Sequence, residues 1–254
     1  MTVTERIDWP GLVKHVAVTD GRVVMLVDPD LEKDAVAGGL LRPWRLISSR
    51  PAGPGTGRGA RGTVRLGNGV TYLVKHCLRG GLLATWNRDR YFMLGRFARE
   101  LHASRVAVES GAPVAPTVAV VLRTRRPGHE AWAVSRFAAG YSDLARLFVS
   151  GGGAALSARA LFEAALVAIH EMHEAGVHHR DMNLGNLVAR QDERGRWQVL
   201  VVDLDRARHC GGPVSARLRS RTLARLERSW VKVLGADGVL SRDERISIES
   251  KLTL

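Results

Sequence analysis

The residues with the clearest capacity for chemistry lie in one short run, HHRDMNLGNLV, at positions 178 to 188. Its Asp181 carboxylate can orient or deprotonate an attacking hydroxyl, and the amide oxygen of Asn186, five positions later, can bind a Mg²⁺ ion. Asp203 follows the apolar run VLVV and can supply a carboxylate oxygen to the same ion. The spacing therefore predicts phosphoryl transfer, with Asp181 as the base and with Asn186 and Asp203 as metal ligands.

A glycine-rich stretch far upstream is the candidate for binding the phosphates of ATP. Gly57, Gly59, Gly62 and Val64 fit the pattern G-x-G-x-x-G-x-V. Glycine lets the backbone approach a phosphate closely, and the N–H groups of such a loop can bind an anion. A Gly-rich linker would fit the same pattern, so the loop indicates a phosphate site only in combination with other residues. A Rossmann site is excluded because a hairpin is expected next instead of a helix, and a Walker site because no Gly-Lys-Ser/Thr occurs.

A lysine and an acid that can complete this site follow the glycines. Lys75 ends the run YLVK, thirteen residues after Gly62, where its ammonium group can reach phosphates beneath the loop. An acid on a neighbouring helix must hold the lysine in place, and Glu100 is the candidate. Glu109 is the rival, but it lies at the predicted helix end beside Gly111, too near the turn to face inward comfortably. Each residue alone would also suit a solvated surface, so the prediction rests on their joint occurrence.

The elements that must position these residues change from mostly strand to mostly helix along the chain. Apolar alternation on both sides of Gly67-Asn68-Gly69 predicts a β-hairpin over 63–76. Apolar residues at helical spacing predict helices over 88–110 and 157–175, each followed by a glycine. Further strands are expected at 22–27, 113–123, 130–137, 187–190 and 197–205.

This order favours an α+β chain with two lobes joined near residues 137–142. We expect an N-terminal arm or leading strands over 1–45 and a small antiparallel-sheet lobe over 46–139. A reduced helical lobe with a basic C-terminal helix is expected over 140–254. The stretch 48–62, dense in Gly and Pro, is expected to be a mobile loop.

The charge balance points to an anionic partner. The chain of 254 residues has 38 Lys and Arg against 25 Asp and Glu, which gives a formal net charge of +13. Nucleic acid, acidic lipid and phosphorylated small molecules would all be attracted. Cys77 and Cys210 are the two cysteines and belong to no CxxC or Cys/His array, so neither a disulfide framework nor a zinc site is predicted. The sequence shows no signal peptide and no membrane-spanning run, so the cytoplasm is the expected location.

Nucleic-acid binding is the main alternative from another functional class. A charge of +13 would supply phosphate affinity through counterion release. Against it, aromatic residues make up only 6% of the chain, and no RNA-recognition motif, zinc finger or recognition helix is found. A catalytically inactive scaffold is also disfavoured, because Lys75, Asp181, Asn186 and Asp203 are all present and an inactive copy would normally have lost one of them.

In their order and spacing these residues resemble the protein-kinase-like fold. A protein Ser/Thr kinase normally has a Lys two positions after the catalytic aspartate, where this chain has Asn183. The metal-binding triplet is Asp203-Leu204-Asp205, without Phe or Gly. The chain ends at residue 254, too soon for an activation segment and a full helical lobe, and no Ala-Pro-Glu follows the triplet. A regulated protein kinase is therefore not expected.

The sequence is more similar to the small bacterial kinases of 3-deoxy-D-manno-octulosonic acid (Kdo), which share one family with the lipopolysaccharide heptose kinases. The likeness covers roughly residues 45 to 235, and its most family-specific parts are Arg-Gly-Gly at 79–81 and Asp-Arg-Tyr at 89–91. It implies ATP-dependent phosphorylation of a hydroxyl, the 4-OH in Kdo kinases, on a Kdo-bearing lipid A precursor. A heptose kinase or another small-molecule phosphotransferase, such as one for aminoglycosides, remains the alternative, because the sequence does not reveal the acceptor pocket.

The resemblance also implies a role for each candidate residue. Asp181 would be the catalytic base, Asn186 and Asp203 would hold Mg²⁺, and Lys75 with Glu100 would hold the phosphates of ATP. These implied roles agree with those that the residue types and their spacing suggest on their own.

Several neighbouring residues have less defined expectations. His179 and Arg180 are expected to support the loop and not to react, and Asp205 matches an acid common in the family without an assigned role. A basic cluster surrounds the proposed site in sequence and suits an anionic acceptor. It consists of Lys75, His76, Arg79, Arg88 and Arg90.

The basic stretch 216–235 allows two interpretations. Leu223, Leu226, Trp230 and Val233 lie near one face of a predicted helix, with arginines on the others. Such a helix can lie on the cytoplasmic face of an anionic inner membrane, as a peripheral membrane protein would. Its apolar face can equally pack on the helical lobe. Apart from the glycolipid and this membrane, the sequence suggests no nucleic-acid partner and no obligate protein partner.

Overall fold

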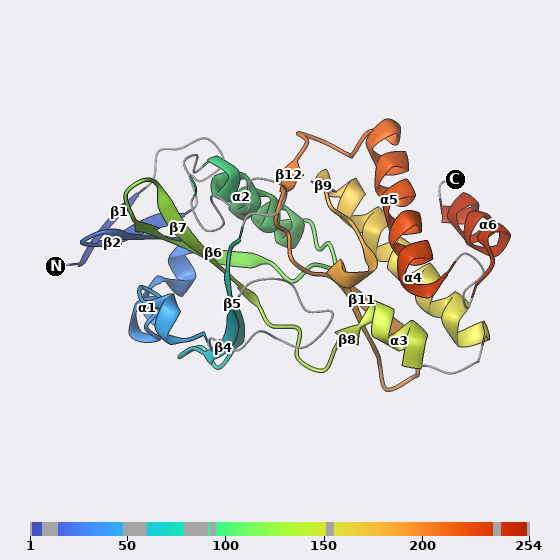
Figure 1. The fold of residues 1–254 in the computed structure, drawn as a ribbon, viewed down its shortest axis with the longest axis horizontal. Coiled ribbons are helices and arrows are strands. Elements are labelled where there is room, and N and C mark those ends of the chain that lie inside the picture. The colour runs from blue at the N-terminus through green and yellow to red at the C-terminus, as the bar shows by residue number, and fades with distance from the viewer. Residues whose placement is uncertain are drawn as a thin grey trace. The chain divides into compact units, whose positions relative to one another are not determined.

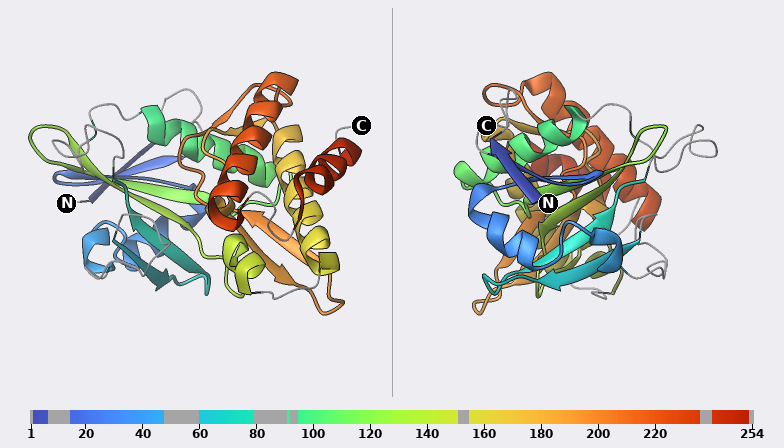
Figure 2. Two further views of the ribbon diagram at one scale, coloured as in Figure 1. Left: turned by 45° about the vertical axis from the view of Figure 1, so that its right-hand side comes forward. Right: turned by 90° about the vertical axis from the view of Figure 1, so that its left-hand side faces the viewer.

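The computed structural model describes residues 2–6, 15–47, 60–78, 91, 95–150, 155–235 and 240–252. Its contacts divide the chain into two compact units, which are drawn in Figures 1 and 2. Unit 1 comprises Met1–His102 and Pro116–Phe137, and unit 2 comprises Ala103–Ala115 and Ala138–Leu254.

Unit 1 is built on an antiparallel sheet, with seven strands among its described residues in the order β1-β2-β3-β6-β7-β5-β4. The strands are β1 Thr2–Arg6, β2 Val16–Asp20, β3 Val23–Val27, β4 Arg61–Arg65, β5 Thr71–His76, β6 Thr117–Thr124 and β7 His129–Arg136. The predicted hairpin is confirmed, because β4 and β5 pair along their length on either side of a turn that contains Gly69 at φ +75°. The pairing of β3 with β6 places the first three strands in the same sheet as the others.

Each face of this sheet has its own core. The described helices here are η1 Pro29–Leu31, α1 Glu32–Ala37, η2 Pro43–Arg45 and α2 Gly95–Glu109, of which α2 belongs to unit 2 from Ala103 onward. Successive strand residues point to opposite faces. Val121 of β6 accordingly shares a core with Ala35 of α1, whereas Val120 shares a core with Leu101 of α2. Figure 1 shows α1 and α2 on opposite sides of the sheet.

Helix α2 carries the candidate acid and ends where the sequence predicts. It begins at Gly95 and ends at Glu109, and Gly111 follows with φ +71°, a conformation that glycine adopts without strain. Of the expected start of this helix, residues 88–90 and 92–94 lie outside the described residues. The prediction is wrong at Tyr91, which forms a β-bridge with His129 instead.

The described residues of unit 2 form helices and two small sheets. Its helices are α3 Leu144–Ser150, α4 Ala155–Glu174, α5 Ala216–Leu234 and α6 Arg242–Leu252, with a 3-10 turn η4 at Leu184–Asn186. One sheet has the order β11-β10-β8, from strands β8 Ser142–Asp143, β10 Leu187–Gln191 and β11 Trp197–Val201. The other pairs β9 Val177–His179 with β12 Ala207–His209. Helix α4, which the sequence predicts clearly, contributes the largest share of the core side chains.

The apolar face of α5 belongs to this core. Leu226 and Trp230 are buried, and the Trp230 ring meets the rings of Phe148 and Phe162 edge to face at 4.7 and 5.1 Å. Of the two interpretations of this stretch, packing on the helical lobe therefore accounts for Leu226 and Trp230. Val233 does not share this burial, since it is 46% exposed. No helix in the described part of the chain is long and apolar enough to span a membrane.

Candidate active site

The loop that contains Asp181 joins β9 to β10 within unit 2. Asn183 begins the turn η4, and its Oδ1 accepts a hydrogen bond from the N–H of Gly185 at 2.9 Å. Asparagine suits this place because its short side chain can satisfy a backbone N–H at the start of a turn. The loop thus has a defined conformation without belonging to a regular strand.

His179 connects this loop to the segment that carries Asp203. The ring is 1% exposed, and its Nδ1 accepts a hydrogen bond from the backbone N–H of Asp181 at 3.1 Å. A neutral imidazole has one donor and one acceptor nitrogen, so Nε2 carries the hydrogen and donates to the carbonyl oxygen of Asp203 at 2.9 Å. One buried ring therefore bridges the backbone at the candidate base and the backbone at the candidate metal ligand.

Two amide side chains hold the carbonyl of Asp181. Nδ2 of Asn183 donates to this oxygen at 2.8 Å, and Nδ2 of Asn186 donates to it at 2.9 Å. Because its nitrogen is used in this way, Asn186 can bind a cation only through Oδ1. The carbonyl of Asn186 in turn accepts the N–H of Val202 at 2.9 Å, next to Asp203. The structure thus brings Asp181, Asn186 and Asp203 into one hydrogen-bonded group.

The backbone of Asp203 has a conformation that is uncommon for residues other than glycine. Its φ is +56°, in the left-handed region that costs free energy for a residue other than glycine and that is common at functional sites. An amide oxygen and a carboxylate are the hard oxygen donors that Mg²⁺ prefers, with phosphates and water completing its shell. Among the described residues there is no cluster of three or more His, Cys, Asp or Glu that would form a metal cage. Oδ1 of Asn186 and the carboxylate of Asp203 are thus donors of the kind that Mg²⁺ binds.

The carboxylate of Asp181 meets a partner that the sequence does not indicate. Nη1 of Arg225, on α5, lies 3.0 Å from Oδ1 of Asp181, and both side chains are about half exposed, at 45% and 55%. Ion pairs of this exposure contribute little stability, so the contact is better understood through its effect on the orientation of the carboxylate. The pairing joins residues 44 positions apart, a distance at which no local pattern in the sequence could reveal it.

Two histidines beside the loop are held neutral. Burial, and next the charge of Arg208, lowers the pKa of His178 from 6.5 to about 4. Burial, and next the charge of Arg219, lowers the pKa of His173 on α4 from 6.5 to about 4. Neither ring is cationic at neutral pH, so the positive charge near the loop comes from guanidinium groups.

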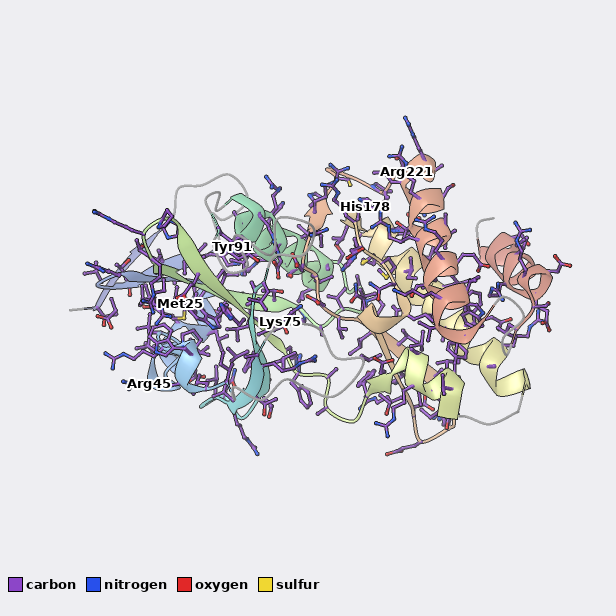
Figure 3. All side chains as sticks on the ribbon, in the orientation of Figure 1. Met25, Arg45, Lys75, Tyr91, His178 and Arg221 are labelled. Carbon is purple, nitrogen blue, oxygen red and sulfur yellow. The ribbon has the colours of Figure 1, made fainter. Side chains whose placement is uncertain are left out.

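In unit 1, Lys75 and Glu100 occupy well-defined elements. Lys75, labelled in Figure 3, lies on β5. Its strand neighbours are Arg61 on one side and Ala133 on the other. Glu100 is only 3% exposed and accepts a hydrogen bond from Oγ1 of Thr117 at 2.9 Å. A buried carboxylate requires such partners. The burial of Glu100 supports its choice as the candidate acid.

The rival acid Glu109 has a different environment. Its side chain is 45% exposed and forms an (i, i+4) ion pair with Arg105 of the same helix at 3.0 Å. Such a pair is a surface feature of modest strength. The exposed position of Glu109 therefore does not suit the acid that holds Lys75 in place.

The glycine stretch is only partly described. Gly57 and Gly59 lie outside the described residues, whereas Gly62 and Val64 lie on β4. A Cβ atom at Gly62 would come within 2.2 Å of the carbonyl oxygen of Leu46. Packing between two backbone segments thus explains this glycine without reference to a phosphate. Val64 is partly buried against the core of unit 1, as a strand residue would be.

Part of the basic cluster also lies outside the described residues, namely Arg79, Arg88 and Arg90, and with them residues 79–81 and 89–90 of the family-specific stretches. Within the described residues, the ring of His76 stacks on Trp132 at 5.0 Å, and Tyr91 is 2% exposed. His76 and Tyr91 therefore contribute to the packing of unit 1.

Comparison with known proteins decides the family. The family described as lipopolysaccharide kinase (Kdo/WaaP) matches residues 48–246, most of the chain. The chain belongs to this family. Among curated relatives, the 3-deoxy-D-manno-octulosonic acid kinase of Stenotrophomonas maltophilia is 31% identical over 79% of this chain and 78% of its own length. The corresponding kinase of Vibrio vulnificus is 27% identical over 74% of this chain and 76% of its own length.

The fold of this lipopolysaccharide kinase also matches a solved structure. WaaP in complex with acyl carrier protein aligns with a TM-score of 0.56 at 19% identity, over 89% of this chain and 88% of that chain. At this identity the match speaks for the fold alone. The α+β, kinase-like fold and the kinase family that the sequence predicts are thereby confirmed.

The structure of this kinase family member adds residues that sequence reasoning missed. Thr117, the hydrogen-bond donor to buried Glu100, lies in a strand that the sequence marks only by its apolar residues. Asn183 appears in the sequence as a departure from the protein kinases, and the structure shows its use as the cap of η4. The contact of Thr117 with Glu100 spans 17 positions and no local pattern reveals it, whereas the contact of Asn183 with Gly185 is local.

Proposed function

We propose that this chain transfers the γ-phosphate of ATP to a hydroxyl, the 4-OH, of Kdo on a lipid A precursor. Membership of the lipopolysaccharide kinase family supports a phosphotransferase. The curated relatives quoted above are kinases of 3-deoxy-D-manno-octulosonic acid, which supports Kdo over heptose as the acceptor sugar.

One observation carries the mechanism, namely the hydrogen-bonded group that His179 and Asn186 build around the backbone of Asp181. In the proposed mechanism, Asp181 accepts the proton of the sugar hydroxyl as that oxygen attacks the γ-phosphorus, and the bond from this phosphorus to the bridging oxygen breaks to release ADP. Asn186 through Oδ1 and Asp203 through its carboxylate would hold Mg²⁺, which when bound neutralises charge on the phosphates. His179 fixes the distance between the backbones of Asp181 and Asp203.

Unit 1 would hold the nucleotide. Lys75 would contact the phosphates and Glu100 would orient Lys75. The stretch with Gly57 and Gly59, which leads into Gly62 and Val64 on β4, would cover the phosphates. Units 1 and 2 would then serve as the N-lobe and the C-lobe of the kinase. Unit 1 includes residues 1–45, which the sequence sets apart as an arm or leading strands, and residues 103–115 belong to unit 2.

The acceptor also suggests where the protein works. A lipid A precursor is an anionic glycolipid, and a net charge of +13 suits an enzyme that operates at the cytoplasmic face of an anionic membrane as a peripheral protein. Since the buried residues of α5 are used inside unit 2, its exposed arginines, among them Arg217 and Arg228, would provide the membrane contact.

Mass spectrometry of acceptors after incubation with Mg-ATP tests the proposal. A Kdo-bearing lipid A precursor and a precursor that carries both Kdo and heptose are compared in parallel. A heptose-specific enzyme would phosphorylate only the second acceptor, on its heptose. We expect one added phosphate, located on Kdo in both acceptors. Phosphate found only on heptose would replace the proposal with a heptose kinase, and no transfer to either acceptor would refute both.

A further inference from the structure

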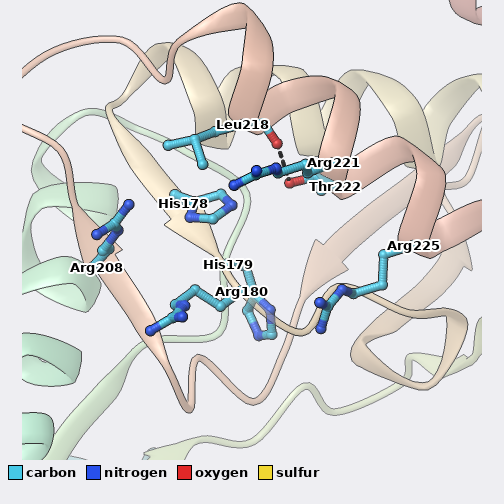
Figure 4. A pocket seen from close by; sticks show the side chains of 8 residues that line it. All are labelled: His178, His179, Arg180, Arg208, Leu218, Arg221, Thr222 and Arg225. Atoms are coloured by element: carbon cyan, nitrogen blue, oxygen red, sulfur yellow. Dashed lines mark hydrogen bonds between the residues drawn. The ribbon is translucent and has the colours of Figure 1, made fainter.

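A cavity of about 220 Å³ lies in unit 2 beside the catalytic loop. Its lining comes from three segments that are distant in sequence, namely β9 with the start of the loop, β12, and α5. The lining residues are His178, His179, Arg180, Arg208, Leu218, Arg221, Thr222 and Arg225 (Figure 4). One water occupies about 30 Å³ in the liquid, so the cavity has room for a group much larger than a few waters.

The cavity is strongly electropositive. Four of its lining side chains are arginines, and no acid lies among the lining residues. The hydroxyl of Thr222 donates to the carbonyl of Leu218 at 3.1 Å, within the helix, so it is already used. Guanidinium groups bind phosphate and carboxylate through paired N–H donors. The lining therefore has the composition of a site for an anion.

His178 gives a second, independent indication of a ligand. The residue is 7% exposed, and its Nδ1 is buried without a hydrogen-bond partner among the described residues. Buried polar atoms normally have a partner, so an orphaned one needs an explanation. Figure 4 shows the ring among the side chains of Arg180, Arg208 and Arg221. A group bound in the cavity would supply the missing partner.

The cavity is also connected to the candidate base. Arg225 lines the cavity and contacts Oδ1 of Asp181 at 3.0 Å. His179 and Arg180 line it and immediately precede Asp181 in the chain. An acceptor with a negative group near its reacting hydroxyl could therefore place that group in the cavity and the hydroxyl at Asp181.

We propose that this cavity binds a phosphate group of the glycolipid acceptor and so positions the reacting sugar next to Asp181. The inference rests on the proposed function, which makes the acceptor an anionic glycolipid. A phosphate matches the cavity better than a carboxylate, because the several guanidinium groups around it can engage more than the two oxygens that a carboxylate has. Arg225 would then be a positioning residue shared between the phosphate and the base.

The first test measures binding without turnover. Thermal unfolding of the full chain is followed at constant ionic strength while inorganic phosphate is titrated. We expect phosphate to raise the melting temperature of the wild type and of Arg194→Gln, a charge-matched control in the turn between β10 and β11. The rise should be largely lost in Arg221→Gln and in Arg208→Gln. Equal rises in all four proteins, or none in the wild type, would overturn the proposal.

The second test identifies where the phosphate comes from. Steady-state kinetics compare a Kdo-bearing acceptor that has its lipid A phosphates with the same acceptor after phosphatase treatment. Loss of one charged hydrogen-bonding partner predicts that Arg221→Gln raises KM for the phosphorylated acceptor about tenfold, with kcat and the KM for ATP little changed. For the dephosphorylated acceptor, wild type and Arg221→Gln should have the same raised KM.

Three further outcomes would each contradict the proposal that the cavity binds a phosphate of the acceptor. If Arg221→Gln raised KM equally for both acceptors, the cavity would not recognise the phosphate of the acceptor. A raised KM for ATP would assign the cavity to the nucleotide. If no Kdo acceptor is phosphorylated at all, the proposed function fails, and the acceptor assignment of the cavity fails with it. The thermal data would still show separately whether the arginines bind phosphate.

Discussion

The candidate residues of unit 1 and those of unit 2 are held in place in different ways. In unit 1, Lys75 occupies a paired strand and Glu100 a buried helix position, so regular structure fixes both. In unit 2, Asp181 and Asp203 lie outside helices and strands, and side chains such as His179 fix their backbones. Strand pairing tolerates many side-chain changes, whereas a loop held by individual hydrogen bonds depends on each of them. The function of Asp181 and Asp203 in unit 2 should therefore be sensitive to residues that never touch the reactants.

The metal ligand should show the largest effect. Asp203→Asn keeps the size of the side chain but removes its negative charge, so the charge on the phosphates is less well neutralised. We expect kcat to fall by about a thousandfold and Mg²⁺-dependent nucleotide binding to weaken. Kinetic assays and titration of nucleotide with and without Mg²⁺ check this. Unchanged Mg²⁺-dependent affinity would remove Asp203 from the metal site.

In unit 1, the buried acid should have the next largest effect. Glu100→Gln keeps the shape and the acceptor oxygen for Thr117 but removes the charge that would hold Lys75. Misplacement of Lys75 predicts a loss in kcat/KM for ATP on the order of a hundredfold. Glu109→Gln is the matched control on the same helix and should have activity close to wild type. If the two variants lost activity equally, the assignment of Glu100 would be wrong.

His179 tests the dependence of the loop on a supporting side chain. His179→Leu removes both hydrogen bonds of the ring, and the loss of such a supporting contact predicts a fall in kcat of about 10- to 100-fold with little change in KM for ATP. Partial rescue by His179→Gln, which can donate and accept, would support positioning. Circular dichroism establishes that both variants are folded, and a folded His179→Leu with normal kcat would contradict the account.

The neutral histidines predict a smaller effect, on stability. Because the pKa of His173 is lowered to about 4 in the folded chain, the unfolded chain binds more protons between pH 6.5 and 4. The free energy of unfolding should therefore fall as the pH falls through this window. His173→Gln should reduce the pH dependence of the free energy of unfolding by about one proton relative to the wild type. Urea unfolding at several pH values measures the slopes, and equal slopes would contradict the burial argument.

The sequence predicts much of this architecture because its strongest signals are local. The Asn-Gly turn predicts the hairpin of β4 and β5, and apolar spacing predicts α4, since each depends on residues close together in the chain. The pairing of Asp181 with Arg225 and the donation from Thr117 to Glu100 depend on tertiary packing, which the spacing of residues does not encode. Apolar spacing in α5 likewise could not distinguish a membrane-facing surface from one that packs around Trp230.

The most direct test of the central claim is a single-turnover measurement with Asp181→Ala. Radiolabelled γ-phosphate transfer from Mg-ATP to a Kdo-bearing lipid A precursor is followed together with the affinity for ATP. Loss of the base predicts that the transfer rate falls by about 10²- to 10⁴-fold while the affinity for ATP stays near that of the wild type. A transfer rate close to wild type in a folded Asp181→Ala protein would contradict the account.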